Sequence, residues 1–131
     1  MWLFTRYGFF SVSVYDKRQF AIRTRAKKHL EQLQARLPFL KRYEIIEDQR
    51  KDYRWRIIIP RNIWIDAMLT ISVEQRWSNF KNEAARFCPD VVYNEVLHTI
   101  WSVLYRAGRQ WDHEQEVVEE KTDAKSIVHK S

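Results

Sequence analysis

Four arginines occupy alternate positions in two short segments, "FAIRTR" and "YRWRIIIP": Arg23 and Arg25 in the first, Arg54 and Arg56 in the second. Alternate residues of a β-strand point to the same face of a sheet, so each pair would present its guanidinium groups on one side. A guanidinium group is a planar fork of N–H donors that matches the oxygens of a phosphate. Two such pairs on one sheet face predict a surface that binds the phosphates of a polyanion.

Other residues extend this predicted surface. Tyr7, in an aromatic segment near the start of the chain, is predicted to supply a ring on which a base can stack. Four basic residues lie near the ends of the predicted strands: Lys27, Lys28, Arg50 and Lys51. Together these residues predict nucleic-acid binding, with RNA ranked slightly ahead of DNA.

A simpler interpretation of the same arginines stays open. An antiparallel sheet with one face in water must place polar side chains there. Acidic residues on the neighbouring predicted strand, Glu44, Glu47 and Asp48, are suitable cross-strand partners for arginine. The sequence therefore allows either a phosphate-binding face or a solvated face whose arginines are ion-paired.

Residues suited to metal binding or catalysis are few. The four histidines, His29, His98, His113 and His129, show no metal-ligand spacing, and Cys88 is the only cysteine. We therefore predict no metal, no cofactor and no catalytic residues. A metal-independent phosphodiesterase, with His29 or His98 as general base beside the arginines, ranks third among the functions considered.

The strands that would position the arginines follow from the alternation of apolar and polar residues. Residues 2–15 are aromatic and β-branched, which predicts one long strand with a bend at Gly8. Residues 20–25 form a second strand, and residues 43–49 and 53–60 form a second hairpin.

Helices are predicted from apolar residues at helical spacing. They cover residues 26–37, 62–71 and 79–87, and a last helix begins at Pro89–Asp90 and ends at Gly108. In that last helix Val92, Trp101 and Leu104 are among the residues expected to face inward. The predicted fold is α+β, with a four-stranded antiparallel sheet in the order β-β-α-β-β-α-α-α and helices packed on one face.

Length and composition predict a single domain. The chain has 131 residues, is 45% hydrophobic and contains two glycines, which suits one compact core over residues 1–110. Residues 111–131 are charged and low in aromatics, and we predict a flexible tail there. The net charge of +6 favours anionic partners.

The setting of the protein is predicted to be the cytoplasm. One cysteine excludes an intramolecular disulfide, and Arg6 interrupts an opening segment too short to cross a bilayer, so no membrane association is expected. Trp111 follows the predicted end of the last helix and either folds back or contacts a partner. The second-ranked function is therefore a protein-interaction module, homodimeric, antitoxin-like or phage-related, that engages an acidic protein partner.

Five segments resemble a family of small uncharacterised bacterial proteins: residues 2–12, 22–33, 52–60, 79–86 and 93–106. The shared signatures are WLFTxYGFFSV, DYRxRI, NFK and WSVLYR. The resemblance implies a standalone cytoplasmic module of one domain, and it brings no assigned activity and no catalytic residue. It also draws attention to polar residues such as Thr5, Arg6, Asn79 and Lys81.

Overall fold

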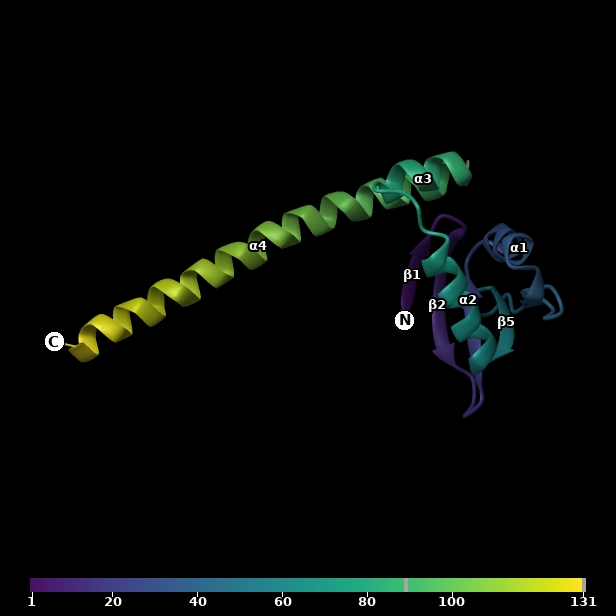
Figure 1. The fold of residues 1–131 in the computed structure, drawn as a ribbon, viewed down its shortest axis with the longest axis horizontal. Coiled ribbons are helices and arrows are strands. Elements are labelled where there is room, and N and C mark those ends of the chain that lie inside the picture. Colours follow the sequence, from purple (N-terminus) through teal and green to yellow (C-terminus); the bar gives the residue numbers. More distant parts are fainter. Residues whose placement is uncertain (89, 131) are drawn as a thin grey trace. The chain divides into compact units, whose positions relative to one another are not determined.

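A computed structural model describes residues 1–88 and 90–130 of the chain, with side chains described as far as residue 125. Pro89, where the last helix was predicted to begin, lies outside the described residues. The chain divides into two compact units, Met1–Asp90 and Val91–Ser131. The first unit contains a sheet and helices, and the second is a helix (Figure 1).

The first unit contains an antiparallel sheet whose strands lie in the order β1-β2-β3-β5-β4. These strands are β1 (Trp2–Thr5), β2 (Gly8–Val14), β3 (Gln19–Thr24), β4 (Ile46–Glu47) and β5 (Trp55–Pro60). The predicted α+β class and antiparallel sheet are confirmed, but the predicted four strands are wrong because the sheet has five.

The additional strand arises because residues 2–15 form a hairpin instead of one long strand. Thr5 pairs with Gly8 across a turn formed by Arg6 and Tyr7. The Thr5 hydroxyl accepts a hydrogen bond from the Tyr7 amide at 3.1 Å and donates one to the Gly8 carbonyl at 2.9 Å. Gly8 adopts a φ of +142°, which L side chains rarely adopt. The prediction of one long strand is wrong because a glycine that follows a tight turn has the same appearance in the sequence as a glycine at a bulge within a strand.

Three helices and a short 3-10 segment complete the first unit. They are α1 (Lys27–Arg36), η1 (Pro38–Leu40), α2 (Arg61–Val73) and α3 (Phe80–Phe87). Pro38 begins η1 one residue beyond the C-cap of α1, Leu37, as expected of a residue that cannot continue an α-helix. Asn79 caps α3, because its side chain accepts a hydrogen bond from the Asn82 amide at 3.1 Å.

The core of the first unit lies against one face of the sheet. Val12, Ile22 and Ile57 are opposite one another on β2, β3 and β5, and all three are buried. Their partners in the core come from α1 and α2, which both contact the sheet: Leu30, Leu33, Trp64 and Ala67. Because side chains alternate along a strand, the residues between these apolar positions point to the opposite face.

The second unit is α4 (Val91–Lys130), a helix of 40 residues. It continues through Gly108, so the predicted helix end there is wrong; a glycine within a helix costs only about 1 kcal/mol. Of the residues predicted to face inward, Leu97 is buried at 5% exposed, whereas Val92, Trp101 and Leu104 are 70%, 49% and 55% exposed and do not face a core. The domain boundary at residue 110 and the flexibility of the tail stay predictions, and side chains from residue 126 onward lie outside the described part. Among the described helices, none combines the length and apolar character needed to cross a membrane.

Candidate nucleic-acid interface

A row of residues crosses the sheet on the face opposite the core. Trp2 lies opposite Ser11, Ser11 opposite Arg23, and Arg23 opposite Arg56. Directly opposed residues of antiparallel strands point to the same face. This face, which we call the arginine face, carries Trp2, Phe4, Phe9, Ser11, Arg23 and Arg56. The register of the sheet thus brings together arginines that are 33 residues apart in sequence.

Arg23 and Arg56 both bond to neutral oxygens. The Nη2 and Nε atoms of Arg23 donate to the hydroxyl and the carbonyl of Ser11, at 2.7 and 3.3 Å. Arg56 Nη2 donates to the Tyr53 carbonyl at 2.9 Å, and Arg56 Nε is buried with no hydrogen-bond partner among the described residues. Neither arginine takes part in an ion pair within the described part of the chain. The positive charge of both groups is therefore not balanced by a bonded carboxylate.

Arg25 and Arg54 are ion-paired. The Nε and Nη2 atoms of Arg25 donate to the two carboxylate oxygens of Asp52, at 2.9 and 2.8 Å. Arg54 donates from Nε and Nη2 to Glu47 Oε1, at 2.9 and 2.5 Å. Hydrogen bonds from these arginines lower the pKa of Asp52 and of Glu47, and Asp52 raises the pKa of Arg25. The solvated, ion-paired interpretation thus describes these two arginines but not the other two.

The ring beside these guanidinium groups belongs to Tyr53. The Cζ atoms of Arg23 and Arg25 lie 4.7 and 4.4 Å from the centre of this ring. Tyr7, the ring named from the sequence, is 0% exposed and belongs to the core cluster. Tyr7 therefore has no exposed surface on which a base can stack, because the hairpin turn directs its side chain into the core.

The other basic residues are spread more widely. Arg50 and Lys51 lie in the turn between β4 and β5, where Arg50 pairs with Asp48 at 3.4 Å. Lys27 Nζ lies 5.4 Å from the centre of the Trp55 ring. Lys28 forms an ion pair with Asp90 at 3.0 Å, and Trp111 is 61% exposed on α4.

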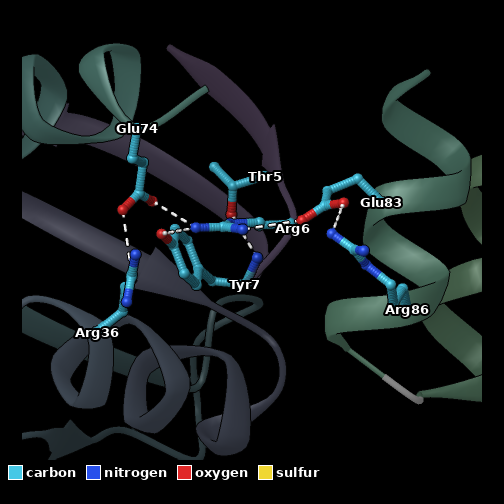
Figure 2. A network of polar contacts seen from close by, with 7 residues as sticks. All are labelled: Thr5, Arg6, Tyr7, Arg36, Glu74, Glu83 and Arg86. Carbon is cyan, nitrogen blue, oxygen red and sulfur yellow. Dashed lines mark hydrogen bonds and ion pairs between the residues drawn. The ribbon is translucent and has the colours of Figure 1, made fainter. Parts of the chain in front are cut away.

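A second arginine cluster lies at the other end of β1, around Arg6 (Figure 2). Arg6 Nη1 donates to Glu83 Oε1 at 2.8 Å, and Arg6 Nη2 lies 3.1 Å from Glu74 Oε1. The remaining carboxylate oxygens pair with Arg36 Nε at 3.1 Å and with Arg86 Nη2 at 2.7 Å. Each glutamate therefore bridges the central Arg6 and one outer arginine.

Arg6 is also enclosed by aromatic rings. Its Cζ atom lies 4.4 Å from the centre of the Phe87 ring, 4.9 Å from that of Trp77 and 5.4 Å from that of Tyr7. Its side chain is only 11% exposed, beside a cavity of about 320 Å³. The two carboxylates and three rings thus balance the charge of this buried cation within the fold, while Arg6 Nε is buried without a hydrogen-bond partner among the described residues. Sequence reasoning missed this network because Arg6 and its acidic partners are about 70 residues apart, a separation that carries no local pattern.

The third polar cluster contains His29, Cys88 and Asp90, whose candidate ligand atoms lie within 4.8 Å of one another. These residue types are zinc ligands in other proteins. The Phe9 amide donates to His29 Nδ1 at 3.4 Å, and His29 Nε2 lies 3.2 Å from Asp90 Oδ2. A metal-bound histidine instead donates from its second nitrogen. The contacts therefore favour a histidine–aspartate pair, and the expected absence of a metal stays a prediction.

The comparisons with known proteins give no functional assignment. No protein-family model matches the chain, and no match was found among curated proteins or among solved structures. The family resemblance of the sequence therefore stays a prediction, and function must be argued from the residues.

Proposed function

We propose that the protein binds nucleic acid, RNA or DNA, through the arginine face. The observation that carries this proposal is the cross-strand pair of Arg23 and Arg56, which lie opposite each other and form no ion pair among the described residues. Opposite charges on directly opposed residues stabilise a sheet, whereas like charges at such positions destabilise it. Two adjacent guanidinium groups with no carboxylate bonded to them can bind the negative charge of a phosphate backbone; Asp52, which is bonded to Arg25, is the acid that acts on Arg23 from a longer distance.

The ion-paired arginines extend this site. Arg25 and Asp52 are 54% and 68% exposed, and exposed ion pairs of this kind contribute little to stability. A phosphate oxygen can replace the Asp52 carboxylate at Arg25 with a small loss, because the same fork geometry serves both anions. The same argument applies to Arg54, whose partner Glu47 is also partly exposed.

A second candidate function is a protein–protein interaction through α4. Leu104, Trp111 and Val118 are seven residues apart and are 55%, 61% and 57% exposed. Residues at this spacing lie along one stripe of a helix, and such stripes join helices in coiled coils. This observation favours an interaction module, in line with the contact role predicted for Trp111.

The binding proposal is tested by fluorescence anisotropy with labelled single-stranded RNA, single-stranded DNA and duplex DNA over a salt series. We expect saturable binding that weakens steeply with salt, because bound arginines release counterions from the phosphates. The double variant Arg23→Gln/Arg56→Gln should bind more weakly, and its log–log salt slope should be shallower by about 1.4 to 1.8.

A matched control removes two exposed arginines from α4, Arg106→Gln/Arg109→Gln, with the same change in net charge. This control should bind like the wild type. Equal losses in the two double variants would mean that only net charge matters, and no binding at low salt would refute the proposal. Light scattering on the same samples reports whether the protein self-associates through α4 instead.

A further inference from the structure

The arginine face carries aromatic rings as well as arginines. Phe4 stacks on Phe9 with ring centres 4.6 Å apart, and Trp2 meets Phe9 edge-to-face at 6.0 Å. Tyr53 continues the series, with its ring centre 6.4 Å from that of Phe9. The face is thus divided, with rings on β1 and β2 and guanidinium groups on β3 and β5.

These rings differ in burial from the aromatic residues of the core. Phe10, adjacent to Phe9 in sequence, is 0% exposed, whereas Phe4 and Phe9 are partly exposed. Trp2, on the edge strand β1, is 70% exposed. Exposed aromatic residues that lie together on a folded surface mark an interaction site more often than scattered ones do. The alternation along β1 and β2 places these rings on the face opposite the core, where they contact one another outside the core cluster.

We propose that the arginine face binds a single-stranded nucleic acid, with bases stacked on Trp2, Phe4 and Phe9 and the backbone phosphates bound by Arg23 and Arg56. This inference rests on the proposed function and specifies its substrate. Proteins that bind single strands combine a basic surface with aromatic rings on which the bases stack. A duplex uses such rings only at the cost of unstacking its bases, because these already stack on one another and expose only their edges in the grooves.

The register of the sheet sets the spacing of the two kinds of group. Trp2 and Arg23 belong to the same cross-strand row and are separated by one strand, which carries Ser11. Neighbouring strands lie about 4.8 Å apart, so the two backbones are roughly 10 Å apart. The rigid sheet therefore holds a stacking ring and a phosphate-binding group at a fixed distance. We propose that a short stretch of one nucleic-acid strand spans this distance.

Tyr53 is a positioning residue in this arrangement. Its ring is 9% exposed and lies beneath the guanidinium groups of Arg23 and Arg25. A guanidinium that rests on an aromatic ring is held in place with its N–H groups at the edge of the stack, and Nη1 of Arg23 is the nitrogen not engaged by Ser11. Arginines ordered in advance lose less side-chain entropy when they bind a phosphate.

The test compares the affinities for a single strand and for a duplex of the same length, using Trp2→Ala and Trp2→Phe variants. We expect the wild type to bind the single strand at least about 10-fold more tightly than the duplex, and Trp2→Ala to lose about 5- to 150-fold in single-strand affinity. The salt slope of Trp2→Ala should equal that of the wild type, because the ring carries no charge. Trp2→Phe, which keeps a ring, should lie between the two. The control is Tyr15→Ala, which removes an aromatic side chain that is 62% exposed beyond the end of β2.

The outcomes separate this inference from the proposed function. Equal affinity for single strand and duplex, with Trp2→Ala binding as tightly as the wild type, would overturn single-strand recognition while leaving the arginine site in place. Absence of binding to any probe would overturn both. Loss of binding in Trp2→Ala together with an unchanged circular dichroism spectrum and unchanged melting temperature would support the stacking role, since a folding defect would alter both spectra and melting.

Discussion

The two arginine clusters of the first unit differ in how their charge is balanced. Arg6 is 11% exposed and contacts two carboxylates, each of which also binds an outer arginine. Arg23 and Arg56 bond to a hydroxyl and to backbone carbonyls and form no described ion pair. Compensated charge in the interior serves the fold, whereas charge without bonded acids on a sheet face remains available for an external anion.

The clusters also differ in what positions them. Arg23 and Arg56 are placed by the register of β3 and β5, which is built from backbone hydrogen bonds. Arg6 lies in a tight turn and depends on Glu74 at the end of α2 and on Glu83 in α3. Substitutions near Arg6 should therefore destabilise the fold, and substitutions on the arginine face should mainly change binding.

The largest effect is expected for Gly8→Ala, beside the Arg6 turn. A Cβ atom at this position would lie 2.2 Å from His29 Cγ, and the φ of +142° is unfavourable for alanine. Steric overlap and backbone strain each cost about 1–3 kcal/mol, so we expect a loss of about 4 kcal/mol in the free energy of unfolding. Urea denaturation followed by circular dichroism measures it.

The matched control for this prediction is Gly108→Ala in α4. Apart from the backbone of its own helix and its chain neighbours, no described atom lies within 4 Å of a Cβ built at Gly108, and alanine favours a helix over glycine by about 1 kcal/mol. The same substitution should therefore stabilise α4. If Gly8→Ala leaves unfolding unchanged, the close approach of His29 to the hairpin is wrong.

The next largest effect is expected for Arg6→Met, which removes the charge and keeps much of the side-chain length. Glu74 and Glu83 would lose their shared buried partner but would keep Arg36 and Arg86. We expect a loss of about 3 kcal/mol, the low end of the range for breaking a buried ion pair. Denaturant unfolding gives the difference from the wild type.

Arg56→Met on the arginine face provides the contrast. It should change the free energy of unfolding by less than about 1 kcal/mol, because no described carboxylate depends on Arg56. Its effect should appear in nucleic-acid affinity instead. Equal destabilisation by Arg6→Met and Arg56→Met would contradict the division into a structural arginine cluster around Arg6 and a binding cluster on the arginine face.

The same contrast explains which features could be predicted from the sequence. The alternation in "FAIRTR" and "YRWRIIIP" predicts arginines on the sheet face away from the core, because a period of two fixes the side of each residue. The contacts of Arg6 with Glu74 and Glu83 and the His29–Asp90 pair join residues about 60 to 77 positions apart, and they depend on tertiary packing that no local pattern specifies.

The errors have the same physical origin. A glycine within an apolar segment is typical both of a bulge in a strand and of the residue after a tight turn. The sequence around Gly8 therefore predicts one strand where the chain forms two. In α4, the spacing of Val92, Trp101 and Leu104 fits an apolar stripe, but spacing does not specify what covers the stripe. The expected exposure of the Tyr7 ring depends on a continuous strand, and the turn between Thr5 and Gly8 directs this ring into the core instead.

The smallest effect is expected in the pH dependence of stability, through His29. Burial lowers the pKa of His29 below its ordinary value of 6.5, although the Asp90 carboxylate opposes the shift; the Lys28 ammonium adds to it. Between pH 7 and pH 5 the unfolded chain therefore binds more protons than the folded chain, and stability should fall as the pH falls. A single proton limits the effect, since a tenfold change in proton affinity corresponds to about 1.4 kcal/mol.

The variant His29→Gln isolates this contribution, because the other histidines remain as a common background. Its free energy of unfolding, measured by urea denaturation at several pH values, should decline less than that of the wild type between pH 7 and pH 5. A glutamine amide can still donate to Asp90, so the comparison removes the titration and keeps a donor. Parallel curves for the two proteins would mean that the pairing with Asp90 cancels the effect of burial, and a wild type that gains stability relative to the variant at lower pH would mean that the pairing outweighs burial.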